Sequence, residues 1–117
     1  MKKQYIKDKE VLNMSVMLEF AMFPTDKGDS LSEYVSRIIK MIDESGVSYK
    51  LTPMGTIVEV ETLDEAMDIV KKAYNQLEPD CQRVSSSIKL DVRKGKSGRL
   101  TQKIESVEKK IGREVKK

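Results

Sequence analysis

The sequence of 117 residues contains no histidine and only one cysteine, Cys81. The absence of histidine removes the usual general base at neutral pH and the commonest metal ligand. A lone cysteine excludes a disulfide framework and the paired spacing of a zinc site, so a reducing cytoplasm is the expected location. No apolar run approaches the roughly 20 residues that a membrane-spanning helix needs. The basic start of the chain also lacks the apolar segment of a secretory signal.

The same absences leave little room for catalysis. The sequence has no serine–histidine–aspartate set, no cysteine–histidine pair, no phosphate-binding glycine loop and no cluster of metal ligands. A pair of carboxylates is the one arrangement left for acid–base chemistry. We therefore expect a protein that is not an enzyme and that holds no cofactor.

Length and composition favour a single soluble domain. With 38% apolar and 35% charged residues, the chain can bury a modest core beneath a well-solvated surface. Residues 1–14 precede the regular pattern, and we interpret them as an N-terminal extension. Residues 15–117 then form the domain.

Positive charge is gathered at the two ends of the chain, although the net charge is only +3. Four of the first nine residues are lysines, and basic residues recur from Arg93 to Lys117. Such runs suit contact with nucleic acid or another acidic surface. Acidic residues such as Glu105, Glu108 and Glu114 interrupt the second run, which favours a solvated tail and helix face.

Four segments alternate between the two sides of a strand, the period of two that is typical of β-structure. The first runs from Ser15 to Phe23, and the clearest runs from Arg83 to Arg93. Between them, Tyr49–Met54 and Thr56–Glu61 flank a Pro-Met-Gly break and predict a β-hairpin.

Two amphipathic helices separate these strands. Each begins with a capping box, Ser30–Glu33 for the first and Thr62–Glu65 for the second. Gly46 and Pro79 mark their ends. Apolar residues recur at helical spacing as Leu31, Val35, Ile38, Ile39 and Ile42, and as Ala66, Ile69, Val70, Ala73 and Leu77.

A third helix is predicted over Arg99–Val115, after the last strand. Its apolar stripe is narrow and consists of Leu100, Ile104, Val107, Ile111 and Val115. A narrow stripe suits docking into one groove more than building a core. We expect this helix to pack against a neighbouring subunit or to close one edge of its own.

The order strand, helix, strand, strand, helix, strand is the split βαβ arrangement of an α+β protein. In this arrangement both helices cover one side of a four-stranded antiparallel sheet, with the first and third strands in the centre. The side chains expected to face the core are those of Val16, Leu18, Phe20, Met22, Val58, Val60, Val84, Ile88, Leu90 and Val92. The opposite side, here called the open face, then carries the alternate residues of each strand.

The open face is neither fully polar nor fully apolar. Met17, Phe23, Met54 and Ile57 would form an exposed apolar patch on a monomer, and soluble proteins tend to avoid such patches. Burial in a homo-oligomer is the expectation that follows. Glu19 and Glu59 share this face on adjacent strands, where a carboxylate beneath an interface needs a partner. Pairing with Lys50 or Lys89, and contact with a small cationic or donor-rich ligand, both stay open.

At this point the residues resemble a known family, the small thiamine-binding proteins, across about Ser15 to Lys110. The hairpin GVSYKLTPMGTIVEVE carries the most specific part of the resemblance. Three further segments also resemble the family: SLSEYV, RVSSSIKLDVR and KIESVEKK. The resemblance implies a ferredoxin-like βαββαβ sandwich with an extra C-terminal helix. It also implies a homo-oligomer of dimers that pair into a tetramer, and binding of thiamine or its hydroxymethylpyrimidine moiety without catalysis.

The resemblance supplies motif positions, and the chemistry of the ligand suggests roles for them. An aminopyrimidine offers an amino donor and ring-nitrogen acceptors, a thiazolium carries positive charge, and flat rings need apolar walls. The motif positions Ser32 and Thr56 are candidates without an assigned contact, and Tyr34, like Tyr49, is a candidate wall for a flat ring. The other candidates are Glu19 and Glu59 for polar recognition, Thr52, Ser85 and Ser87 for further hydrogen bonds, and Phe23 and Met54 for ring contact.

Two positions depart from the pattern of the family. Val60 stands where a glycine is frequent, and the loop after the first strand carries Thr25, Asp26 and Lys27 where small residues are common. Either change could weaken or retune binding.

Two other functions stay open from the residues alone. One is a structural or regulatory homo-oligomer whose sheet serves assembly and takes no ligand. The other is nucleic-acid binding, in which bases stack on aromatic residues of the central strands. Phe23 is the one aromatic residue expected on that part of the open face, beside two carboxylates, so we favour a cytoplasmic carrier, buffer or sensor of thiamine.

Overall fold

The structure of the chain, a computed structural model, describes residues 14–95 and 98–116. Its strands are β1 (Ser15–Pro24), β2 (Ser48–Thr52), β3 (Gly55–Val60) and β4 (Val84–Arg93). Its helices are α2 (Ser32–Ser45), α3 (Leu63–Leu77) and α4 (Arg99–Ile111). Apart from Met14, the predicted N-terminal extension lies outside the described residues.

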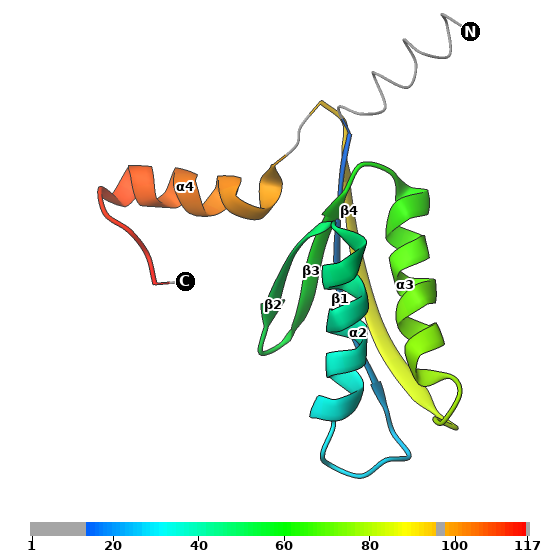
Figure 1. Ribbon diagram of the computed structural model, residues 1–117. Coiled ribbons are helices and arrows are strands. Elements are labelled where there is room, and N and C mark those ends of the chain that lie inside the picture. The colour runs from blue at the N-terminus through cyan, green and yellow to red at the C-terminus, as the bar shows by residue number, and fades with distance from the viewer. Residues whose placement is uncertain (1–13, 96–97, 117) are drawn as a thin grey trace, which may run out of the picture.

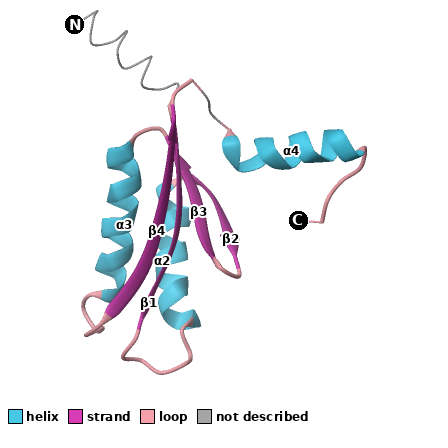
Figure 2. Cartoon of the chain, turned by 180° about the vertical axis from the view of Figure 1, so that it is seen from behind, coloured by secondary structure: helices cyan, strands magenta, loops and turns pink. Residues whose placement is uncertain are grey.

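The four strands form one antiparallel sheet in the order β2-β3-β1-β4. Helices α2 and α3 both cover the same side of it (Figure 1). Seen from behind, the open face lies in front of these two helices, and α4 projects past the β2 edge (Figure 2). The predicted α+β fold, a ferredoxin-like sandwich with an extra C-terminal helix, is therefore confirmed.

The hydrophobic core lies between the sheet and the two covering helices. Strand β1 supplies Val16, Leu18, Phe20 and Met22, and all four are buried. The alternation in this strand places these residues on one side, because successive side chains point to opposite faces. Burial of each large side chain stabilises the fold by about 1.5–3 kcal/mol. The remaining core residues are Ile38, Ile42, Val58, Val60, Ala66, Ile69, Ala73, Leu77 and Cys81.

Strand β4 departs from the predicted core. Ile88, Leu90 and Val92 are 43%, 38% and 48% exposed, so their assignment to the core was wrong. The register places them opposite Phe20, Leu18 and Val16, and they therefore share the helix-covered side. However, β4 is an edge strand, and α3 packs mainly on the two central strands. The alternation correctly identified the side of the sheet on which these β4 residues lie. Whether they are buried depends on how far α3 extends over that side.

The two helices begin differently. At α3 the Thr62 hydroxyl accepts a hydrogen bond from the Glu65 backbone N–H, so this predicted cap is confirmed. At α2 the predicted capping box is wrong, because Leu31 is the N-cap and no side chain caps it. The Leu31 carbonyl instead accepts from the N–H groups of Tyr34 and Val35. The end of α2 at Gly46 is confirmed, with a left-handed φ of 81°.

The loop after β1 is tied to the start of β4. The Asp26 carboxylate accepts from the backbone N–H groups of Gln82 and Arg83, at 2.8 and 3.4 Å. The Thr25 N–H donates to the Arg83 carbonyl at 2.8 Å. The Asp26 side chain therefore has a structural role, since it holds the two chain segments together.

Helix α4 ends at Ile111, earlier than the predicted Val115, because Gly112 adopts a left-handed φ of 76°. None of its described residues is buried, and Val107 and Ile111 are 41% and 51% exposed. The first turn of α4 rests on the sheet, and the rest extends away from it (Figure 1). Its apolar stripe is thus largely uncovered.

Candidate functional site

The open face of the sheet holds six of the predicted ligand-binding residues. Residues directly opposite in an antiparallel pair share a face. The pairs Glu19↔Lys89, Ala21↔Ser87 and Phe23↔Ser85 between β1 and β4 therefore point the same way. The pairs Met17↔Glu59 and Thr52↔Gly55 also lie on this face. The six residues are Glu19, Phe23, Thr52, Glu59, Ser85 and Ser87, and Figure 2 looks onto this face.

The other four predicted residues lie elsewhere. Ser32 and Tyr34 belong to α2, on the opposite side of the sheet. Thr56 pairs with Phe20 and is 5% exposed on the helix-covered side. Met54 lies in the hairpin turn and is 88% exposed. One ligand on the open face can therefore reach Met54, but not the other three.

A shallow depression of about 290 Å³ brings several of these residues together beside the hairpin turn. We call it the Glu19 depression. Its lining includes Glu19, Ala21, Met54, Ser87 and Lys89. Carboxylate, hydroxyl and ammonium groups thus surround a small residue, with a flexible thioether at one side. Glu19 and Lys89 lie directly opposite each other on β1 and β4, and their side chains form no ion pair with each other.

The hairpin turn places Met54 beside β1. The Thr52 hydroxyl donates to the Gly55 carbonyl at 2.8 Å and accepts from the N–H groups of Met54 and Gly55. A Cβ at Gly55 would lie 2.9 Å from the Phe20 carbonyl oxygen. Only glycine lets the turn approach β1 this closely. Thr52 therefore shapes the depression through the turn, with its hydroxyl already engaged.

Glu59 has a different role from a free open-face carboxylate. It accepts hydrogen bonds from the Ser15 hydroxyl and from the backbone N–H groups of Arg99 and Leu100. Burial by itself would raise the pKa of Glu59, but these donors and the Arg99 charge outweigh it and hold the pKa below its usual value. Of the two possibilities that the sequence left open for Glu59, pairing with Lys50 or Lys89 does not occur within the described chain, because its partners come from β1 and α4.

Arg99 completes this junction between the sheet and α4. Its guanidinium donates to the Ser15 hydroxyl at 2.9 Å, to the Ser15 carbonyl at 2.8 Å and to the Asp91 carbonyl at 2.7 Å. It also pairs with the Asp91 carboxylate at 3.1 Å, and only 11% of its side chain is exposed. The basic tail was expected to be solvated, and Arg99 was not among the predicted functional residues. Gly98 was the available signal, since an N-cap without a side chain leaves the first N–H groups of a helix in need of an acceptor.

A second cleft, of about 250 Å³, lies on the helix-covered side of the same turn. Its lining is mainly apolar and includes Val35 and Ile39 of α2, and Leu51 and Pro53 of the hairpin. Thr56 also borders it. The segments SLSEYV and TPMGT therefore meet at this cleft, although they are far apart in the sequence. It can hold an apolar group, but it offers no charged side chain.

The described residues contain no group of three or more histidine, cysteine, aspartate or glutamate side chains that could hold a metal ion. Within the same part of the chain, no helix is long and apolar enough to cross a membrane. The groups that line the Glu19 depression offer hydrogen bonds and charge. Glu19 can accept, Lys89 can donate and Ser87 can do both, which suits a flat ring that carries donors and acceptors on one edge.

The fold and this site define a small ferredoxin-like α+β protein with a polar depression on its open sheet face. The chain belongs to the family described as thiamine-binding protein, whose family model matches residues 18–108.

Relatives from distant organisms agree with this assignment. A UPF0045 protein of Mycobacterium bovis is 34% identical over 95 residues, which cover 81% of this chain and 93% of that protein. A UPF0045 protein of Methanothermobacter thermautotrophicus is 39% identical over 83 residues, or 70% of this chain and 84% of that one. The family resemblance inferred from the hairpin is thus confirmed.

Solved structures show the same fold. The crystal structure of a hypothetical protein from Methanocaldococcus jannaschii matches with a TM-score of 0.71 at 32% identity, covering 80% of this chain and 95% of that one. A Thermotoga maritima protein, assigned provisionally to thiamine biosynthesis or salvage, matches with a TM-score of 0.69 at 27% identity. That comparison covers 80% of this chain and 98% of the other.

Proposed function

We propose that this protein binds thiamine, or its hydroxymethylpyrimidine moiety, without catalysis, as a carrier, buffer or sensor in the cytoplasm. The observation that carries the proposal is the Glu19 depression, a donor- and acceptor-bearing site in a member of the thiamine-binding family. The lone, buried Cys81 is in keeping with a reducing compartment.

The aminopyrimidine is the part of the ligand that this depression suits best. Its exocyclic amino group donates to the Glu19 carboxylate, and a ring nitrogen accepts from the Lys89 ammonium. Ser87 supplies a third hydrogen bond from β4. The ring itself lies over Ala21, with the Met54 thioether against one face, because sulfur packs favourably on aromatic rings. Phe23 and Ser85 continue this surface one rung further along the strands.

Calorimetric titration with thiamine and with hydroxymethylpyrimidine tests the proposal. We expect Glu19→Gln to weaken the binding of both ligands about tenfold or more, since a charged hydrogen bond contributes about 1.5–3 kcal/mol. Glu44→Gln is the matched control, because Glu44 is an exposed carboxylate on the outer side of α2. That control should leave the affinity unchanged.

Two results would overturn the proposal. One is the absence of binding heat with either ligand, from protein that is folded and free of carried-over ligand. The other is binding that survives Glu19→Gln and Ser87→Ala unchanged, which would move the site away from the open face. The alternative, an assembly module that takes no ligand, predicts the first result.

We also propose that the chain associates with copies of itself. The apolar stripe of α4 supports this, since Val107 and Ile111 are exposed and none of the described residues of the helix is buried. On the open face Phe23 is 36% exposed and Met17 and Ile57 are half-buried. Association through these surfaces would remove apolar area from water, the main favourable term in such contacts. A tetramer built from two dimers is the expected assembly.

A further inference from the structure

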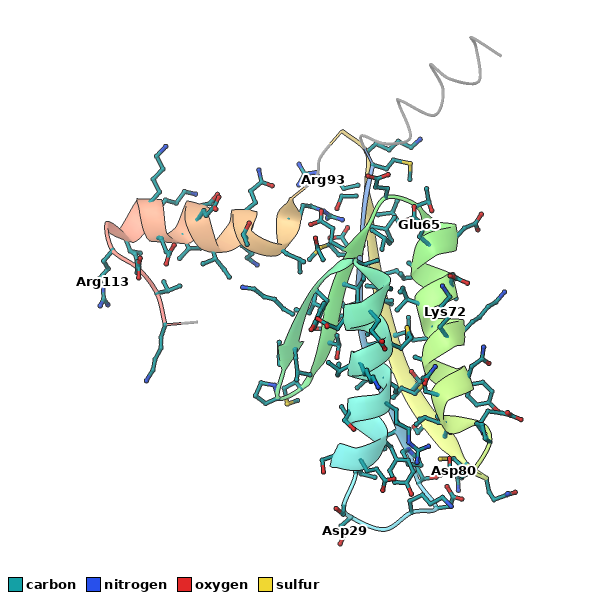
Figure 3. All side chains as sticks on the ribbon, in the orientation of Figure 1. Asp29, Glu65, Lys72, Asp80, Arg93 and Arg113 are labelled. Carbon is teal, nitrogen blue, oxygen red and sulfur yellow. The ribbon has the colours of Figure 1, made fainter. Side chains whose placement is uncertain are left out.

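A second depression lies on the open face, in the corner between the sheet and the start of α4. Its volume is about 410 Å³, and its lining includes Met17, Asp91, Arg93, Arg99 and Lys103. We call it the Arg93 depression. Figure 3 shows Arg93 near the end of β4, close to where α4 begins. The Glu19 depression contains none of these residues, so the two sites are distinct.

The charge of the Arg93 depression is positive. Its one carboxylate, Asp91, is paired with Arg99 at 3.1 Å. The side chains of Arg93 and Lys103 form no hydrogen bond or ion pair with any residue that the structure describes. Gln102 and Ser106 add an amide and a hydroxyl from the same side of α4. Two uncommitted cations with neutral donors beside them are suited to an anion.

The two depressions lie in line along the same strands. In the register of β1 and β4, Glu19 lies opposite Lys89, Met17 opposite Asp91, and Ser15 opposite Arg93. These are three successive cross-strand pairs, here called rungs, on the open face. Alternate residues of a strand are about 7 Å apart. Arg93 therefore stands two pairs, or about 14 Å along the strand, from the Glu19–Lys89 pair, and Lys103 of α4 borders the same corner. Met17 supplies an apolar floor between them.

From this arrangement we propose that the open face takes the phosphorylated form of its ligand, with the phosphate in the Arg93 depression. This inference rests on the proposed function for the position of the pyrimidine. The pyrimidine occupies the Glu19 depression, and the thiazolium ring crosses Met17. The phosphate ester at the far end of the molecule then reaches Arg93 and Lys103. Arginine matches phosphate geometry by donating two parallel hydrogen bonds, and lysine adds a mobile point charge.

Affinity for thiamine monophosphate, compared with thiamine, is the direct test. We expect the monophosphate to bind about tenfold more tightly at low salt, since each exposed cation contributes about three- to fivefold. The double variant Arg93→Gln/Lys103→Gln should remove this difference and leave thiamine binding unchanged. Raising the salt concentration to about 0.2 M should shrink the difference, because exposed charges are then screened beyond about 8 Å.

Lys40→Gln is the matched control. Lys40 is an exposed cation on α2, on the far side of the sheet. Its substitution should leave the difference in affinity between thiamine monophosphate and thiamine unchanged. Equal affinities for thiamine and its monophosphate would overturn the inference. A preference that persists in the double variant would do the same, and so would tighter binding of a single-stranded oligonucleotide than of the monophosphate.

Inorganic pyrophosphate separates this inference from the proposed function. If neither form of thiamine binds, the proposed function fails, but the anion site can still be observed by nuclear magnetic resonance. Pyrophosphate should then shift the amide signals of Met17, Lys103 and Ser106 in the native protein but not in the double variant. Unchanged signals would show that the Arg93 depression binds no phosphate.

Discussion

Glu59 caps helix α4 from another part of the chain: its carboxylate accepts the backbone N–H of Arg99 at 3.0 Å, forty residues away. A second bond comes from the Leu100 N–H at 3.3 Å. These donors are among the N–H groups at the start of a helix that have no partner within the helix. Glu59 thereby connects the central strand β3 to an element that otherwise extends away from the domain.

Removing this cap should loosen α4. We expect Glu59→Ala to lower the free energy of unfolding by about 1 kcal/mol, the usual cost of losing an N-cap acceptor. Amide hydrogen exchange should accelerate in the first turns of α4, while β1 and β3 stay protected. Glu61→Ala is the control, because this exposed carboxylate follows the same strand, and it should change stability by less than about 0.5 kcal/mol. Equal exchange in both variants would contradict the capping role.

Acid should destabilise the loop contacts at the other end of the domain. Hydrogen bonding from the Gln82 N–H lowers the pKa of Asp26, and hydrogen bonding from the Arg37 guanidinium lowers the pKa of Asp80. Both fall below the ordinary value of 3.8. Because each folded-state pKa is depressed, the stabilisation is fully present above that ordinary value and is lost as the pH falls through the lowered pKa.

Thermal unfolding between neutral pH and pH values below 3.8 measures this effect. Asp26→Asn should melt at a lower temperature than the native protein near neutrality, and the difference should narrow in acid. Asp29→Asn, in the same loop, is the control and should melt like the native protein throughout. A difference that stays constant with pH would show that the Asp26 charge is not involved.

Gly55 should tolerate alanine poorly. Its φ is 157°, and an added Cβ would stand 2.9 Å from the Phe20 carbonyl oxygen, so the backbone of the turn or of β1 must move. We expect Gly55→Ala to cost about 1–3 kcal/mol in urea unfolding. Gly112→Ala provides the comparison, since its φ of 76° is strained but nothing lies within 4 Å of the added Cβ. It should cost about 1 kcal/mol, and a larger loss at Gly112 would contradict the steric argument.

The stripe of α4 should control self-association. We expect Val107→Glu to shift the sedimentation of the protein toward smaller species, because a charge would have to be buried in the contact. Thr101→Glu adds the same charge at an exposed position outside the stripe and should sediment like the native protein. A native protein that already sediments as a monomer would contradict the proposed association.

The local pattern predicted those features that depend on a few neighbouring residues. Alternation identified β1, whose four core-facing residues Val16, Leu18, Phe20 and Met22 are all buried, and β4, whose apolar residues lie on the predicted side. Helical spacing located α3, and the Thr62 cap followed from residue type alone. The hairpin motif predicted the family, which the family model matches over residues 18–108.

What the sequence by itself determined is therefore the order of the elements, the side on which the residues of β1 and β4 lie, and the family. Tertiary structure alone decided that Leu90 is exposed and that Glu59 caps helix α4. Exposure of Leu90 depends on how far α3 reaches across the sheet, and capping by Glu59 depends on where α4 begins. Period and residue type report local geometry, whereas coverage and hydrogen-bond partners arise from contacts between segments far apart in the chain.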